Sequence, residues 1–495
     1  MLWFALHLPA LPLEAWRSAA ADRADARPGC VVDARCVVQA DALALAAGIE
    51  PGMSAATAAS LAAGLQVFAR DPLRVAALVE RLALALARFT PSIVLQRDGV
   101  LLEVAASLRL FGGARALWRA VRDAAQAGGV QTLRMAAAPT ATAASVLARA
   151  EPRSPALQRL PTAQRLDALP LADALAAWGI DERQRVLLHG IGCRTLGDVR
   201  MLPRTGAQRR GMAPLLDVIA RAHGDAPDPQ PWFELPRRFE QGLELLQRAD
   251  DAAMLVFAAQ RLVQPLAGWL AQQWLAATQL TLVLRHETSV RHALPDTALT
   301  LALADPTRDA AQVLLLLRER LQRTALPAPV YALVLRLDHA VRHAGRDTTL
   351  WRERGGAGED ARALFDRLAA RLGAERVCRP ALVADHRPER AMAWQPVRDA
   401  APASDVAPVN AARPAWLLPA PQALAEDRAS GQPLYRGAPL ALRGRPERIE
   451  AGWFDGALVS RDYLVAEARD RRCLWVFRER RGDDVPRWYL HGVFG

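Results

Sequence analysis

The feature that most constrains the fold is a hairpin signal near residue 100. Two short apolar segments, residues 92–96 and 100–104, are joined by Arg97-Asp98-Gly99. An Asp-Gly pair between apolar runs is typical of a tight turn between antiparallel strands. Residues 2–8 and 132–137 also have strand patterns, and the helical patterns cover residues 72–88, 114–127 and 140–150. The first 150 residues are therefore expected to form an α+β domain around one sheet.

The composition limits the class of protein. The chain has 495 residues, a net charge of +11 and a pI near 10.5, which predicts several domains and attraction to polyanions, most often nucleic acid. All of the basic residues are Arg, so part of the excess can reflect a biased coding sequence. No apolar run approaches the roughly 20 residues of a membrane-spanning helix, and residues 1–10 lack the basic region of a signal peptide. We expect a cytoplasmic, nucleoid-associated protein with no membrane partner.

The cysteine and histidine residues do not have the spacing of a metal site. The five cysteines are scattered, without the spacing of metal ligands or of a disulfide framework. His7 lies on the first predicted strand, and the sequence places no acid beside it, so we interpret it as a packed histidine. No metal and no cofactor are expected.

Residues 181–202 have the pattern of two helices joined by a glycine hairpin. Gly190-Ile191-Gly192 separates the helices, and Thr195 and Asp198 have the spacing of a capping box. In such a motif the backbone N–H groups at the start of the second helix can approach a DNA phosphate without reading base sequence. The predicted DNA-binding residues are Gly190, Gly192, Arg194, Thr195, Arg209 and Arg210. An ordinary corner between two helices, with no ligand, is the alternative.

Shifts in composition predict further domains. After a Pro-rich stretch near residue 230, strand and helix patterns alternate again, and residues 391–412 are a linker rich in Pro and Ala. The last segment has four tryptophans among short strand patterns and turns, which indicates a small, mostly β domain. The predicted boundaries are 1–160, 161–235, 236–390, 391–412 and 413–495.

The order of these units resembles that of the Y-family translesion DNA polymerases, and the chain as a whole resembles the catalytically inactive ImuB-type branch. The resemblance implies a multidomain α+β architecture: palm and fingers (1–160), helix-hairpin-helix thumb (161–235), little finger (236–390) and an extra C-terminal domain (413–495). The segments near the C-terminus are the most specific. The resemblance is carried by residues 5–9, 11–14, 48–53, 107–113, 190–192, 446–453, 461–463 and 490–494.

The resemblance also implies that the catalytic site is lost. Active members hold two metal ions with three carboxylates, one on the first strand and an adjacent Asp-Glu pair on the hairpin. Here residues 1–13 contain no acid, Asp98 matches the first residue of the pair, and Gly99 replaces the second. The positions that contact the incoming triphosphate fall on Ala42, Leu45 and Ala141. We predict no catalytic residue, with Asp98 vestigial; a weakly active, metal-dependent translesion polymerase is the alternative.

The implied function is that of a scaffold in damage-induced (SOS) mutagenesis. Such a protein binds primer-template DNA and joins the beta sliding clamp, a RecA-like accessory protein and an error-prone replicative-type DNA polymerase, which performs translesion synthesis. A structural DNA-repair factor that acts without the clamp is a weaker alternative.

One candidate segment for the clamp follows the last predicted strand of the third domain. Bacterial clamp-binding peptides have the form Gln-x-x-Leu-Phe, whose apolar side chains enter a pocket. Asp347, Leu350 and Trp351 fit this form, except that Asp347 replaces Gln. A Leu-Trp pair packed under a loop is the alternative.

The C-terminal domain is the candidate site for the other partners. By resemblance alone, the partner-binding residues are Trp453, Arg461, Asp462, Tyr463 and His491. Of Trp453, Trp475 and Trp488, we expect two to belong to the core of the domain. His491 has a packed histidine as its alternative.

Overall fold

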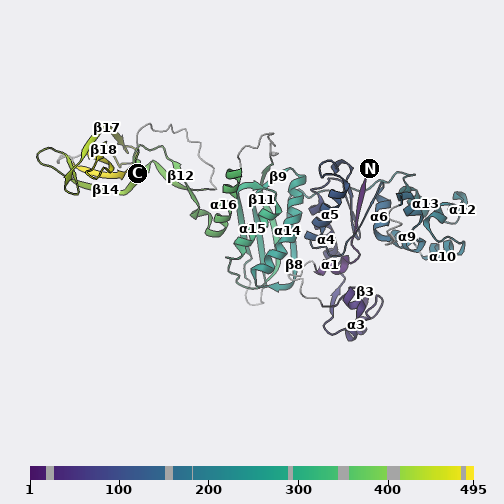
Figure 1. The fold of residues 1–495 in the computed structure, drawn as a ribbon. Helices are drawn as coiled ribbons and strands as arrows, with labels where there is room; N and C mark the ends of the chain where they lie inside the picture. The colour runs from purple at the N-terminus through teal and green to yellow at the C-terminus, as the bar shows by residue number, and fades with distance from the viewer. Residues whose placement is uncertain are drawn as a thin grey trace. The chain divides into compact units, whose positions relative to one another are not determined.

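The computed structural model describes residues 1–17, 27–150, 160–180, 182–287, 294–343, 356–397, 413–480 and 487–494 (Figure 1). The chain divides into two units, residues 1–371 and 372–495. The division falls before residue 390, where the sequence predicts the end of the third domain. The strands β12 (Cys378–Leu382) and β13 (Met392–Pro396) belong to the C-terminal unit. Arg387, which lies between them, donates hydrogen bonds to Asp455 of the same unit. None of the described helices is long and apolar enough to cross a membrane.

The palm-like sheet is antiparallel, with the strand order β5-β6-β1-β7. Alternate residues of β1 contribute to two cores: Phe4 and Leu6 pack with α4 and α5, whereas Trp3 and Ala5 pack with α6 and the helices that follow it (Figure 1). A strand buried on both faces needs an apolar run without alternation, which is what residues 2–8 provide. The predicted hairpin and helices are confirmed. The elements are β1 (Trp3–His7), α1 (Leu11–Arg17), α4 (Pro72–Leu86), β5 (Ile93–Gln96), β6 (Gly99–Glu103), a 3₁₀ turn (Ala105–Ser107), α5 (Ala114–Ala127), β7 (Arg134–Ala138) and α6 (Ala141–Ala150).

A small finger-like subdomain is inserted between α1 and α4. It has a three-stranded sheet in the order β3-β2-β4, of which β2 and β4 are parallel. The Ser54 side chain accepts a hydrogen bond from the Thr57 N–H and caps the start of α3. The sequence did not predict the sheet. The elements are β2 (Gly29–Asp33), β3 (Cys36–Ala40), α2 (Ala42–Ala46), α3 (Ala55–Leu61) and β4 (Gln66–Ala69).

The thumb-like region is helical among its described residues. Thr195 and Asp198 form the predicted capping box at the start of α11, and Gly192 has a φ of +94°, a backbone conformation that favours glycine. The buried side chains of these helices pack against α6 and the palm-like sheet. The helices are α8 (Thr162–Asp167), α9 (Leu171–Trp178), α10 (Glu182–Gly190), α11 (Leu196–Arg200), α12 (Arg204–Arg209) and α13 (Ala213–His223).

The little-finger-like region has a four-stranded antiparallel sheet in the order β10-β9-β11-β8, with α14 and α15 packed against it. α14 also packs closely on α4: a Cβ atom at Gly268 would lie 1.9 Å from the Leu84 carbonyl oxygen. Leu84 belongs to the core of this region, so palm-like and little-finger-like regions share buried surface. The elements are β8 (Glu240–Ala249), α14 (Ala252–Gln272), β9 (Leu275–His286), β10 (Thr297–Thr307), α15 (Ala310–Leu321), β11 (Val330–Arg342) and α16 (Gly356–Leu372).

The C-terminal unit is mostly β. Its seven-stranded sheet has the order β16-β15-β14-β20-β19-β18-β17. Trp475 and Trp488 are buried and Trp453 is 70% exposed, so the prediction that two of these three tryptophans are core residues is confirmed. Its described residues include the 3₁₀ turns Ala374–Arg376 and Pro388–Arg390. Its main strands are β14 (Trp416–Glu426), β15 (Pro433–Tyr435), β16 (Ala438–Pro439), β17 (Ala441–Ala451), β18 (Val459–Glu467), β19 (Cys473–Glu479) and β20 (Trp488–Val493).

Candidate functional site

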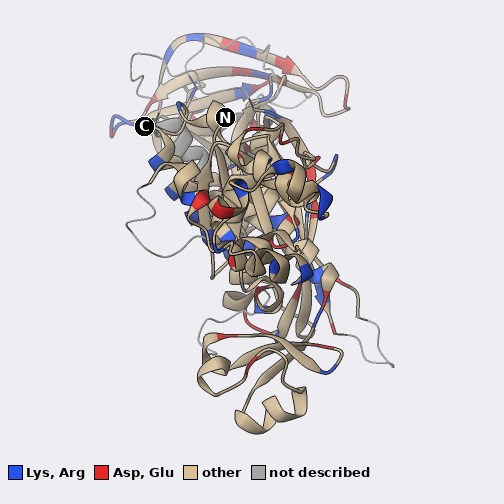
Figure 2. Cartoon of the chain, turned by 90° about the vertical axis from the view of Figure 1, so that its right-hand side faces the viewer, with Lys and Arg blue, Asp and Glu red and all other residues tan. Residues whose placement is uncertain are grey.

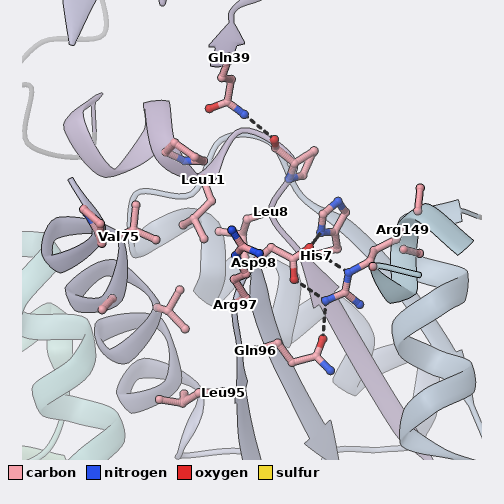
Figure 3. Close-up of a pocket in the computed structure, with 18 of the residues that line it drawn as sticks. His7, Leu8, Leu11, Gln39, Val75, Leu95, Gln96, Arg97, Asp98 and Arg149 are labelled. Carbon is pink, nitrogen blue, oxygen red and sulfur yellow. Dashed lines mark hydrogen bonds and ion pairs between the residues drawn. The ribbon is translucent and has the colours of Figure 1, made fainter. Parts of the chain in front are cut away.

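Asp98 lies at the turn between β5 and β6, and an arginine from α6 holds its carboxylate (Figure 3). The Arg149 Nε donates to one carboxylate oxygen at 2.9 Å, and the same guanidinium donates to the other oxygen. It also donates to the Gln96 side chain at 2.8 Å and to the Ser145 carbonyl at 3.0 Å. A bidentate pair fixes both partners in orientation, so Asp98 is bound by a cation that belongs to the protein itself.

His7 approaches the same carboxylate from β1. Its Nδ1 lies 3.1 Å from an Asp98 oxygen, an acid that the sequence alone could not place beside this histidine. Burial alone would raise the pKa of Asp98, but the contacts with His7 and Arg149 and their charges outweigh that effect and hold the pKa well below its usual range. Asp98 is therefore ionised and paired at neutral pH.

Gly99 leaves no room for a second carboxylate. It pairs with His7 across β1 and β6, and a Cβ atom built on it would lie 1.9 Å from the Leu6 carbonyl oxygen and 3.2 Å from the His7 Cα. Both neighbours are backbone atoms of a paired strand, which cannot rotate away as a side chain could. Any residue with a side chain at position 99 would require the two strands to separate.

The paired Asp98 and Arg149 line a cavity of about 800 Å³. Arg70 and Arg97 also line it, together with apolar residues from the turn between β1 and α1, from α1 and α4, and Trp178 of α9. Among the described residues that line this cavity, Asp98 is the one acid. In the part of the chain that the structure describes, no group of three or more His, Cys, Asp or Glu residues could hold a metal ion.

The positions predicted for lost triphosphate contacts carry no charge towards this cavity. Ala42 begins α2 and Leu45 is 50% exposed on the same helix, while Ala141 is buried at the start of α6. None of the three is among the residues that line the cavity.

Comparison with known protein families identifies one domain of this chain. Residues 18–149, which include the finger-like subdomain, the hairpin and Arg149, match the impB/mucB/samB family. The chain carries a domain of this family. Over 483 residues the chain is 29% identical to Protein ImuB of Caulobacter vibrioides, from strains NA1000 / CB15N and ATCC 19089 / CIP 103742 / CB 15; the match covers 90% of this chain and all of the relative.

Solved structures similar to this chain include a Dbh ternary complex and DinB from Sulfolobus solfataricus. The first is 15% identical with a TM-score of 0.38, and the second is 15% identical with a TM-score of 0.36. Each match covers 69% of this chain and 99% of the other.

The thumb-like hairpin that follows the impB/mucB/samB domain presents fewer free amides than predicted. The N–H groups of Arg194 and Thr195 both donate to Asp198 at 2.8 Å, and those of Ile191 and Gly192 donate to carbonyl groups of α10. A phosphate would have to displace these bonds, so the structure does not support the predicted contact through hairpin amides. The exposed side chains of Arg194, Arg209 and Arg210 are the candidates that remain.

The thumb-like region has no excess of arginine over acid. Residues 161–235 contain as many acidic as basic residues. In the view of Figure 2, basic and acidic segments lie interspersed. Attraction of DNA to this region would therefore depend on local arginine clusters rather than on a large positive field.

Some of the residues predicted to bind partners in the C-terminal unit are buried, and others are exposed. Tyr463 and His491 are 1% and 0% exposed, and the Tyr463 hydroxyl lies 2.7 Å from the His491 Nδ1. Burial raises the pKa of Tyr463 to about 12 and lowers that of His491. Side chains this buried cannot touch a partner, so the packed alternative for His491 is the better description.

The other members of that set differ in exposure. Arg461 donates to Glu389 at 2.9 Å and is mostly covered, and Asp462 accepts hydrogen bonds from Arg448 and Arg480. Trp453 is the most exposed. The predicted clamp segment, Asp347, Leu350 and Trp351, lies outside the described residues.

Sequence reasoning missed the residue that defines the site. Arg149 lies 51 positions from Asp98, and arginines are too frequent in this chain for one to stand out. A signal was nevertheless present: Arg149 is the one charged residue of the helix Ala-Thr-Ala-Ala-Ser-Val-Leu-Ala-Arg-Ala, whose other residues are small or apolar, and it lies in the last turn.

Proposed function

We propose that this protein is a non-catalytic relative of the Y-family polymerases that binds DNA and partner proteins in an error-prone translesion synthesis complex. One observation carries the proposal: the carboxylate of Asp98, where the family resemblance places a metal ligand, is held by the Arg149 guanidinium. A bound divalent cation would have to displace a partly buried, bidentate guanidinium, which is unfavourable.

The second support is the loss of space for a catalytic carboxylate. Two-metal phosphoryl transfer requires several oxygen ligands that converge on two ions. With Gly99 in contact with the β1 backbone, position 99 cannot supply one without a change in the sheet. Activity would then need ligands from elsewhere, and Asp98 is the one acid among the described residues that line the cavity.

Binding to primer-template DNA is proposed through phosphate contacts by Arg194, Arg209 and Arg210. Such contacts need no metal and carry little sequence preference. The test is the affinity for a fluorescent primer-template in EDTA, with Arg209→Ser/Arg210→Ser as the variant. The variant should weaken binding and flatten its salt dependence. An unchanged affinity would refute this interface, and no binding by the wild type would refute the DNA-binding role.

The partners proposed are the beta sliding clamp, a RecA-like accessory protein and an error-prone replicative-type polymerase. For the clamp, Leu350→Ala/Trp351→Ala should abolish capture in a pull-down, and retained capture would refute the segment. For the other two partners, the exposed Trp453 is the candidate contact. Trp453→Ala should reduce their capture, whereas Trp416→Ala, equally exposed on β14, is the matched control.

A further inference from the structure

A second cavity, of about 430 Å³, lies where α4 meets the sheet of the little-finger-like region. It is lined by Arg74 and Arg81, two turns apart on α4, by Arg285 of β9, and by the acids Asp71 and Glu244. Leu243 of β8 and Tyr331 and Leu333 of β11 also line it. The cavity thus combines three arginines and two acids with an apolar wall. Asp71 caps the start of α4 and Glu244 pairs with Arg74, so neither acid is paired with Arg81. Among the described residues, none lines both this cavity and the one around Asp98.

Arg81 is buried without a matching carboxylate. Arg81 is 6% exposed. Among the described residues, it makes one hydrogen bond, a long one of 3.4 Å from its Nη1 to the Gly242 carbonyl. Burial, and then the nearby Arg74 charge, lower the pKa of Arg81 to about 10, so the group is still charged at neutral pH. The adjacent acid, Glu80, accepts a hydrogen bond from Gln241 at 3.3 Å.

The neighbouring Arg74 is also a cation, so it cannot neutralise the charge of Arg81. It is held in place by the Glu244 carboxylate at 2.6 Å, and its guanidinium carbon lies 4.2 Å from the centre of the Trp16 ring. Its Nε is buried and has no hydrogen-bond partner, since the closest Asp71 oxygen lies 3.7 Å away. The structure therefore keeps two guanidinium groups near one another with several unused donors.

We propose that this cavity binds a phosphate group, with Arg81 as its main ligand and the Arg74 Nε as a second donor. A buried guanidinium without an acid is costly unless an anion or water satisfies its donors. The planar fork of N–H groups matches two oxygens of a phosphate. The volume exceeds that of inorganic phosphate, and the apolar wall suits the base or sugar of a mononucleotide.

The test measures binding of inorganic phosphate, pyrophosphate and adenosine 5′-monophosphate to the full chain, by calorimetry and thermal shift at constant ionic strength. We expect saturable binding by the wild type, with the monophosphate ester bound more tightly than inorganic phosphate if the apolar wall contributes. Arg81→Met should weaken binding at least about tenfold, as expected for the loss of a charge-assisted contact. Equal affinity for inorganic phosphate and the nucleotide would assign the site to free phosphate.

The matched control is Arg88→Met. Arg88 follows α4, its pKa is likewise lowered by burial, and it donates to Gln264 at 3.0 Å, but it does not line this cavity. Arg88→Met should keep full affinity. If Arg81→Met fails to fold by circular dichroism, Arg81→Lys replaces it and should show partial loss.

Two results would overturn the proposal: no saturable binding by the wild type, which would leave water as the partner of Arg81, or equal affinity in the Arg81 and Arg88 variants. The experiment contains neither DNA nor partner proteins. Its failure would thus leave the proposed scaffold function untouched.

Discussion

Gly99→Ala should destabilise the palm-like sheet, because the space for even one methyl group is absent. The added Cβ would lie 1.9 Å from the Leu6 carbonyl oxygen, although such contacts normally require roughly 3.4 Å between carbon and oxygen. The β1 and β6 strands would have to move apart near His7. That movement would stretch the bond from the Leu8 N–H to the Asp98 carbonyl, now 2.9 Å long.

The cost can be estimated from its parts. Overpacking a rigid interior costs about 1–3 kcal/mol, and each weakened backbone hydrogen bond adds about 0.5–1.5 kcal/mol. With one such bond affected, Gly99→Ala should lower the free energy of unfolding of this sheet by about 2–4 kcal/mol. Gly99→Glu, which would restore an acid at this position, should cost at least as much and should not restore metal binding.

The assay is hydrogen–deuterium exchange of the amides of β1 and β6, together with urea unfolding. Exchange reports local stability, which is useful because a chain of two units need not unfold in one step. The control is Gly242→Ala, also in a strand, where the new Cβ would make ordinary contacts at 3.8 Å. If Gly99→Ala protected these amides as well as Gly242→Ala does, the steric argument would be refuted.

Three further predictions follow from other contacts. Arg149→Met should destabilise the protein by about 1–3 kcal/mol at pH 7, reduced from a fully buried pair because Asp98 is one-third exposed. The pKa of Asp98 is lowered in the folded state, so the difference in unfolding free energy between this variant and wild type should have its full size well above pH 3.8, the pKa of the unfolded chain. The difference should shrink as the pH falls below that value. A difference in unfolding free energy that does not change with pH in urea titrations would contradict the pairing. Gly268→Ala should cost about 2–4 kcal/mol by separating α4 from α14, and an unchanged thermal midpoint would argue against that close approach. Arg387→Met should release the loop that carries Trp453, seen as faster exchange at residues 452–458; unchanged exchange would show that Arg387 does not hold the loop.

Much of the local structure could be predicted from the sequence because local signals were strong. The Asp-Gly turn and its apolar flanks gave the β5–β6 hairpin, and the Thr195–Asp198 spacing gave the capping box of α11. In both cases the interacting residues are close in the chain. That no second carboxylate follows Asp98 was also visible in the sequence, since the adjacent Gly99 has no side chain.

Other elements could not be predicted because their signals come from distant packing. α14 is apolar on nearly all sides and contains Pro265, so it has neither a polar stripe nor a continuous helical pattern. The pairing of Asp98 with Arg149, and the burial of Tyr463 and His491, depend on segments that meet only in the folded chain. Likewise, the spacing of Asp198 predicts its capping role, but only the folded geometry shows that its carboxylate occupies the Arg194 and Thr195 amides that a phosphate would need.

The measurement that most directly tests the account is primer extension on undamaged and lesion-containing templates, with Mg²⁺ or Mn²⁺, using wild type, Asp98→Ala and Arg149→Ala. The account predicts that wild type binds the primer-template and that none of the three proteins extends it. Extension by wild type that is lost in Asp98→Ala would contradict the account, because it would show that Asp98 works as a metal ligand despite Arg149 and that the chain is a weakly active polymerase.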